Sequence, residues 1–294
     1  MLLRYGALAL GVLIVSTAAL LIRWAIDAGA HPLTVAAARL TLAAALIAPV
    51  AWLRRSQELR SLGRADWSVA ALSGVLLAVH FATWIASLVY TSVASSVALV
   101  TTNPVWVGLA AWLILREPPS RSTLMGILLA AAGTACILLS DVQTAASAPA
   151  GREPMLGNGL ALLGAISISG YLLVGRRLNL KLSLLAYIAI VYGAAAIAMN
   201  LIAWGLGHGI ESLPWAALAP IVLLALGPQL AGHTLINASL RHLTPTFVAL
   251  AILGEPVGSA ILAWLLLGES VAGLQLLGFV VLLGGIVVAA RGER

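Results

Sequence analysis

Long apolar runs separated by short polar stretches make up almost the entire sequence. An α-helix needs about 20 mostly apolar residues to cross the ~30 Å hydrocarbon core of a bilayer, and each run reaches or approaches this length. The expected fold class is therefore all-α and integral to a membrane. The runs predict ten transmembrane helices, at residues 5–22, 32–53, 67–89, 92–115, 121–140, 156–175, 183–206, 214–240, 244–268 and 271–290.

Two of these runs share a sequence pattern at a distance of 152 positions. Asn103-Pro104-Val105 in the fourth run corresponds to Glu255-Pro256-Val257 in the ninth, and 7 of the 14 positions from Pro104 to Glu117 are identical to their counterparts. A repeat of half the chain indicates a duplicated half-protein rather than a solenoid. The match continues without a gap at Leu124 and Leu276, Gly126 and Gly278, and Gly133 and Gly285.

The repeat divides the chain into two units. We expect a first five-helix unit at residues 1–140 and a second at 156–294. The segment 141–155 is rich in Ala, Pro and Gly and is the expected linker, on the periplasmic side. Because five is odd, the second unit must insert with the opposite orientation, which gives two inverted repeats. Such repeats recur in secondary transporters, which work by alternating access around a midplane site where the repeats meet.

Composition agrees with the membrane setting. The chain is 62% hydrophobic and 9% charged, whereas soluble domains carry about 25% charged residues. The net charge of +6 does not indicate a nucleic-acid partner, because the charges lie in short loops between apolar runs. The single cysteine, Cys136, excludes an intramolecular disulfide.

The basic residues predict the orientation in the membrane. With both termini in the cytoplasm, the outer loops hold only Arg23 and Arg152, as the positive-inside rule requires. Arg39 lies within a predicted helix. The other 13 of the 16 Lys and Arg residues are then cytoplasmic: Arg4, Arg54, Arg55, Arg60, Arg64, Arg116, Arg121, Arg176, Arg177, Lys181, Arg241, Arg291 and Arg294.

Polar side chains inside the predicted helices are candidates for a central cavity. Gln229, His233 and Asn237 follow one another at a spacing of four, which places them on one helix face, after the helix-breaking Pro228. The alternative is that such residues only bond neighbouring helices. Three other helices carry further candidates for substrate contact: His80 and Trp84; Thr102, Asn103 and Trp106; and Ser167 and Tyr171.

Two ionisable residues lie deeper in the apolar runs. Glu255 is close to the middle of the ninth run and is a candidate partner for a substrate ammonium group or a proton carrier, or a structural acid beside a proline break. Arg39 has a structural role or binds a substrate carboxylate. Pro104 and Pro256 interrupt equivalent helices, so they and Pro228 are candidate hinges.

Other classes of protein find little support. The sequence has no His-Glu-x2-His or similar metal pattern, no activated nucleophile and no P-loop, so we expect no enzyme, no metal and no cofactor. The expected partners are a small-molecule substrate and the lipid bilayer, and the oligomeric state is left open. A channel-like facilitator or a lipid or drug translocator is the alternative to a carrier.

The repeated pattern resembles the EamA-type unit of the drug/metabolite transporter superfamily. The likeness rests on Leu99 to Glu117 with Gly126 and Gly133, repeated as Ala251 to Glu269 with Gly278 and Gly285, and on Arg39 and Tyr90-Thr91. Ala251 replaces the first leucine in the second copy. The resemblance implies an exporter of amino acids or related metabolites in a bacterial inner membrane, similar to aromatic amino acid and threonine/homoserine exporters. It does not fix the substrate.

Overall fold

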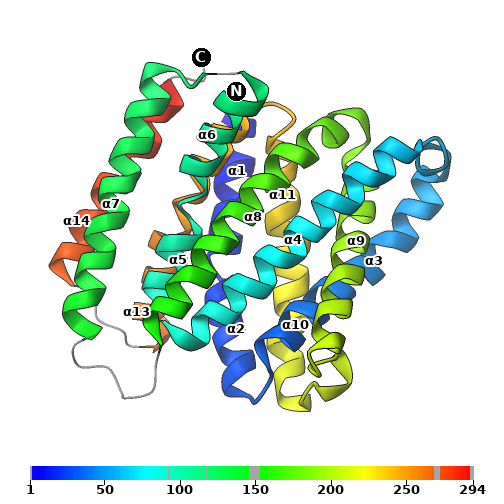
Figure 1. Ribbon diagram of the computed structural model, residues 1–294, viewed down its shortest axis with the longest axis horizontal. Helices are drawn as coiled ribbons and strands as arrows, with labels where there is room; N and C mark the ends of the chain where they lie inside the picture. Colours follow the sequence, from blue (N-terminus) through cyan, green and yellow to red (C-terminus); the bar gives the residue numbers. More distant parts are fainter. Residues whose placement is uncertain (1, 92, 117, 146–152, 268–271, 292–294) are drawn as a thin grey trace.

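The structure is a computed structural model that describes residues 2–91, 93–116, 118–145, 153–267 and 272–291 (Figure 1). All regular secondary structure in these ranges is helical. Residues 146–152 of the predicted linker lie outside them, as do Glu117 and Glu269. The helices are α1 Leu2–Val15, α2 Ala18–Asp27, α3 Pro32–Arg60, α4 Arg64–Tyr90, α5 Val93–Val100, α6 Asn103–Leu115, α7 Arg121–Ala145, α8 Pro154–Lys181, α9 Leu184–Gly205, η1 Ile210–Ser212, η2 Trp215–Ala217, α10 Leu218–Leu224, η3 Ala225–Gly232, α11 His233–Ser239, α12 Pro245–Ile252, α13 Glu255–Leu267 and α14 Gly273–Ala290.

Seven helical segments of the described chain are long and apolar enough to cross a membrane. Two shorter apolar helices coincide with the predicted fifth and tenth spans, and α5 and α6 together cover the fourth. The all-helical membrane fold is thus confirmed, and the count of ten spans stays a prediction. The seven segments are Tyr5–Asp27, Pro32–Arg60, Arg64–Tyr90, Met155–Lys181, Leu184–Gly205, Trp215–Ser239 and Pro245–Leu266.

Two helices break at equivalent places in the repeat. The first ends at Val100 and resumes at Asn103, and its counterpart ends at Ile252 and resumes at Glu255. Each residue of the first break is displaced from its equivalent in the second by 152 positions. The cause is the proline that follows each restart, because a proline cannot donate to the carbonyl group four residues earlier, which belongs to Val100 or Ile252. Proline is instead favoured in the first turn of the new helix.

The first and eighth predicted spans are also irregular. Between α1 and α2, the hydroxyl groups of Ser16 and Thr17 donate to the carbonyl oxygens of Val12 and Ile14, both at 2.8 Å. These bonds take up carbonyl groups at the end of α1, where the helix is interrupted. The eighth span contains the π-helix η3 around Pro228, so the spacing of four residues no longer corresponds to one full turn there.

Helices α7 and α14 form a closely packed pair at one edge of the molecule (Figure 1). A Cβ atom on Gly133 would lie 2.6 Å from the carbonyl oxygen of Gly278, and one on Gly126 would lie 2.7 Å from that of Gly285. Only glycine permits this approach of the two backbones. Because the lower number on one helix faces the higher number on the other, the two helices are antiparallel.

Elsewhere the two halves of the chain interleave. Extensive contacts join α4 to α8 and α9, α3 to α9, and α1 to α11 and η3. Helix α1 begins and α14 ends at the same end of the helical bundle (Figure 1). The core therefore lies between the halves, and polar groups buried in it come from helices far apart in sequence.

Polar contacts join the halves at the end of the bundle where α3 begins. The rings of His31 and His208 stack with centroids 3.4 Å apart, and the Thr34 hydroxyl donates to the His208 carbonyl oxygen at 2.9 Å. Partial burial and the nearby His208 imidazole lower the pKa of His31, so the stack holds neutral rings more readily than charged ones.

A second set of contacts joins the halves where α3 ends. Lys181 donates to Asp66 at 2.6 Å, and the Glu58 carboxylate accepts hydrogen bonds from the backbone amide and the hydroxyl of Ser183. Within the second half, Arg241 donates to the carbonyl oxygen of Asn179 at 2.8 Å. The two sets lie at opposite ends of α3.

Candidate functional site

A small cavity lies in the core between the two halves. Three of the helix interruptions open onto it, because the residues on either side of each belong to its wall. These pairs are Val15 and Ala18, Val100 and Asn103, and Ile252 and Glu255. The rest of the wall consists of His80, Trp84, Thr101, Ile168, Tyr171, Leu172, His233 and Ile236.

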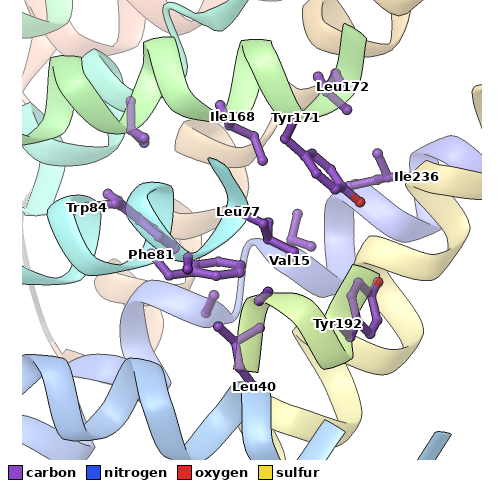
Figure 2. Close-up of a cluster of buried hydrophobic side chains, with 14 of the residues drawn as sticks. Val15, Leu40, Leu77, Phe81, Trp84, Ile168, Tyr171, Leu172, Tyr192 and Ile236 are labelled. Carbon is purple, nitrogen blue, oxygen red and sulfur yellow. The ribbon is translucent and has the colours of Figure 1, made fainter. Parts of the chain in front are cut away.

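Six of the residues predicted to contact substrate line this cavity: His80, Trp84, Asn103, Tyr171, His233 and Glu255. Figure 2 shows Trp84, Ile168, Tyr171 and Ile236 around the same space. The six predicted residues come from α4, α6, α8, α11 and α13, and so from both halves of the repeat. The structure thus brings together residues that the sequence offered only as separate stripes.

One of the two histidines of the cavity wall, His80, is fixed by a backbone contact. His80 Nδ1 lies 3.0 Å from the carbonyl oxygen of Gly164. Since a carbonyl oxygen only accepts, Nδ1 carries the hydrogen, and Nε2 of the neutral ring is an acceptor. The ring also stacks on Trp84, with centroids 5.7 Å apart and planes inclined by 20°. His80 can therefore accept a hydrogen bond from a solute beside an aromatic surface.

Glu255 is the acidic member of the wall. It is the first residue of α13 and is 8% exposed. The N-terminus of a helix favours negative charge, because its first amide groups point outward without partners. Arg39 lies within electrostatic range of this carboxylate. The site therefore holds a single carboxylate among aromatic and neutral polar groups of the described wall.

Arg39 itself lies behind the wall. Its side chain is fully buried, and Nη2 donates to Oε1 of Gln229 at 2.9 Å. The guanidinium lies over the ring of Phe81, 4.0 Å from the centroid. The same ring forms a T-shaped pair with His233 of the cavity wall, with centroids 5.5 Å apart and planes at 88°. Phe81 thus contacts both Arg39 and a wall residue, and sequence reasoning missed it, although it lies three residues before Trp84.

The three polar residues of the eighth span have three different partners. His233 faces the cavity, Gln229 bonds Arg39, and Asn237 accepts a hydrogen bond from the Tyr171 hydroxyl at 2.7 Å. The expected common face assumed regular α-helix. The π-helix η3 has i to i+5 hydrogen bonds and therefore more residues per turn than an α-helix. Residues four positions apart within it do not lie on the same face as they would in an α-helix.

The other candidates lie outside this cavity wall. Trp106 Nε1 donates to the Thr102 hydroxyl at 3.3 Å. Thr102 and Pro104 line a separate pocket between α6, α7 and α12, while Trp106 lines a lateral groove between α4, α6 and α8. Ser167 is buried on α8. The described residues contain no group of three or more His, Cys, Asp or Glu side chains placed to hold a metal ion.

Comparison with known proteins decides the class. The model of the EamA-like transporter family matches residues 3–139 and again residues 155–291. The chain belongs to the EamA-like transporter family. The resemblance seen in the sequence is thus confirmed, and this membership indicates a membrane transporter rather than an enzyme.

Two further likenesses agree with the family. The chain is 23% identical over 266 residues to the "Uncharacterized transporter YwfM" of Bacillus subtilis (strain 168), covering 90% of this chain and 86% of that protein. A solved crystal structure of a protein aligns with a TM-score of 0.72 at 20% identity and covers 98% of this chain and 99% of the other. The second likeness concerns the fold alone.

Proposed function

We propose that this EamA-like transporter is a secondary carrier that exports amino acids, aromatic and other neutral ones, or related small metabolites across a bacterial inner membrane by alternating access. In this proposal the chain crosses the membrane ten times with both termini in the cytoplasm. Its halves, 1–140 and 156–294, are inverted relative to each other, and residues 141–155 join them on the periplasmic side.

The observation that carries the proposal is the meeting of three helix interruptions at one cavity. Secondary transporters bind substrates near the midplane at discontinuous helices, where the ends of half-helices supply amide and carbonyl groups. Here α6 and α13 both begin at the cavity with a polar residue, Asn103 or Glu255, followed by proline. Two equivalent breaks from two repeats are what a carrier with a shared central site requires.

The packing of the helices supports an inverted relation between the halves. Exchanging the repeats turns the contact of Gly126 with Gly285 into that of Gly278 with Gly133, and both contacts are present. The same exchange relates the pairing of the first and eighth spans to that of the sixth and third, and both pairings are extensive. A two-fold relation of this kind explains why both repeats break at the same position.

The chemistry of the wall suits a zwitterion with an apolar or aromatic side chain. Glu255 accepts the ammonium group or carries a coupled proton, while His80, His233 and Asn103 exchange hydrogen bonds without a permanent charge. Trp84 and Tyr171 supply flat apolar surfaces, and an indole face also attracts cations. In the proposal, Gln229 positions the Arg39 guanidinium and Asn237 positions the Tyr171 hydroxyl. Thr102, Trp106 and Ser167 contact the substrate only in another state of the cycle.

Alternating access requires that the two ends open in turn. The contacts of His31 and Thr34 with His208 close one end, and those of Asp66 with Lys181 and Glu58 with Ser183 close the other. Pro104 and Pro256 are the proposed pivots, assisted by Pro228. Opening one end breaks a few polar contacts while the other set holds the halves together.

Counterflow in proteoliposomes tests the proposed function. The purified protein is reconstituted, the vesicles are loaded with one unlabelled amino acid at a time, and uptake of a panel of radiolabelled amino acids is followed with and without a pH gradient. A carrier gives saturable uptake that rises when the same solute is present inside. Uptake that neither saturates nor responds to internal solute for any member of the panel would contradict a carrier.

A lipid or drug translocator is the second candidate, and a specific feature favours it. A lateral groove lies between α4, α6 and α8, and its wall is mostly apolar. It adjoins the cavity, because Ser169 in the groove donates to the carbonyl oxygen of Asn103 at the cavity. Transfer of a fluorescent lipid analogue between leaflets by reconstituted protein, without amino acid counterflow, would favour this alternative.

A further inference from the structure

Buried hydrogen-bond donors exceed acceptors around the cavity. In the described part of the chain, five buried N–H-bearing atoms have no acceptor: Arg39 Nε and Nη1, Trp84 Nε1, Gln229 Nε2 and Asn237 Nδ2. On the acceptor side of the same described residues, Asn103 Oδ1 and the hydroxyl groups of Ser73, Tyr187 and Thr234, which can also donate, have no partner. The side-chain oxygens of Gln229 and Asn237 accept from Arg39 and Tyr171, and the Tyr192 hydroxyl interacts with both amide side chains. Such an imbalance in a buried region is costly and favours a ligand that brings acceptors.

Arg39 is at the centre of this imbalance. Its guanidinium keeps its positive charge in proteins and has five N–H donors in a fixed plane. One group bonds Gln229, and the guanidinium carbon lies over the Phe81 ring, which attracts the cation but has no oxygen or nitrogen acceptor for the N–H groups. A planar fork with free N–H groups matches a carboxylate, which can accept two parallel hydrogen bonds.

One aromatic ring contacts both this arginine and the cavity wall. Phe81 has the Arg39 guanidinium over its ring and forms a T-shaped pair with His233, which belongs to the cavity wall. Leu40 and Leu77 are drawn beside Phe81 in the same cluster (Figure 2). A rotation of the Phe81 side chain away from His233 would connect the cavity with the free side of the guanidinium.

We propose that Arg39 and the Gln229 amide form a buried subsite for the carboxylate group of the transported solute, with Phe81 as its cover. The claim that the carboxylate belongs to a transported solute rests on the proposed function. The subsite itself can be tested by binding alone. The carboxylate then lies on the side of α3 and η3, and Glu255 at the start of α13 is left for the ammonium group. One solute is thus recognised at both charged ends.

Four compounds that share a phenyl group separate the two charges: L-phenylalanine, L-phenylalaninamide, 3-phenylpropionate and 2-phenylethylamine. Their binding to the purified full-length protein is measured from the rise in Tm with ligand concentration. The wild type should bind phenylalanine more tightly than its amide, and should bind 3-phenylpropionate. Arg39→Gln should weaken binding of both carboxylates roughly 30-fold or more, and leave 2-phenylethylamine unchanged.

Two further variants make the result specific. Gln229→Glu places a carboxylate of the chain beside Arg39, so it should raise the Tm of the free protein and abolish the response to 3-phenylpropionate. Arg23→Gln removes an arginine that is paired with Asp27 at the end of α2, and it should leave all four affinities unchanged. A purely structural Arg39 predicts instead a lower Tm for Arg39→Gln with its preference for carboxylates intact.

Three results would overturn the subsite: no response of the wild type to 3-phenylpropionate, equal affinity for phenylalanine and its amide, or a preserved carboxylate preference in Arg39→Gln. Failure of the proposed function can be told apart from failure of the subsite. If only the function fails, the wild type shows no counterflow but keeps the predicted binding pattern. If Arg39→Gln does not fold, Gln229→Glu decides the question on its own.

Discussion

An acidic side chain in the core of a membrane protein is expensive unless it is hydrated, paired or protonated. Glu255 meets this cost at the start of a helix and at the wall of a cavity, where a cationic group of a solute can replace water. The equivalent position of the other repeat is Asn103, which lines the same cavity without a charge. The two halves therefore share a backbone break and differ in chemistry at the residue that begins the second half-helix.

Glu255→Gln tests the charge, because it keeps the shape of the side chain. We expect a folded protein that binds 2-phenylethylamine at least about tenfold more weakly and whose flux depends less on pH, since the carboxylate that accepts the ammonium group or a proton is gone. Glu153→Gln, at an exposed position before α8, is the matched control and should behave as the wild type. Unchanged binding, flux and pH profile in folded Glu255→Gln would rule out a role for its charge.

At the scale of the helix, small sequence features decide the shape. Proline in the first turn of α6 and α13 creates the breaks, and glycine at the contact of α7 with α14 sets the distance between them. These features repeat in both halves, so each half contains one helix that restarts at a proline and one helix that packs through glycine. We infer that the glycine-packed pair is a rigid edge against which the broken helices move.

Replacement of Pro104 or Pro256 by alanine tests the pivots. Alanine restores a donor to the carbonyl group of Val100 or Ile252 and favours a continuous helix, which stiffens the break. We expect the rate of counterflow to fall more than the affinity for solute. Pro154→Ala, in the first turn of α8 and away from a break, is the control. Wild-type rates in both variants would reduce the prolines to packing features.

Gly133→Ala tests the rigid edge. The added Cβ would meet the carbonyl oxygen of Gly278 at 2.6 Å, so the helices must separate, and the stability of the folded protein should fall by about 1–3 kcal/mol. Gly159→Ala on α8 is the control, because a Cβ atom added there would meet no other atom within 4 Å, and alanine favours a helix by about 0.5–1 kcal/mol. Equal Tm changes in the two variants would contradict close packing at Gly133.

The sequence predicted the all-helical membrane fold and the interruptions at Pro104 and Pro256, since both depend on local signals such as apolar run length and proline, but it did not predict the break between α1 and α2. It did not predict the partners of the polar residues. Gln229 and Arg39 are 190 positions apart, and the π-helix that turns Gln229 toward Arg39 depends on packing around Pro228 rather than on a pattern of residue types. Phe81 was missed for the same reason, because its role follows from what lies on its two sides.

The whole molecule combines a repeated sequence, equivalent helix contacts made by its two halves and a cavity between them. None of these alone distinguishes a carrier from a pore. What distinguishes them is whether the cavity communicates with one side of the membrane at a time. Ile168 suits a test, because it lines the cavity and has no proposed role in binding.

The most direct measurement is the labelling of Ile168→Cys in a Cys136→Ala background by a membrane-impermeant thiol reagent, applied to right-side-out and to inside-out vesicles. Leu163→Cys on α8 is the control. In the proposed membrane arrangement this exposed side chain faces lipid rather than water, so the reagent should reach it from neither side. The account predicts that Ile168→Cys reacts from both sides, and that saturating transported solute on the opposite side slows each reaction. Reaction from one side only, whatever solute is present, would contradict alternating access.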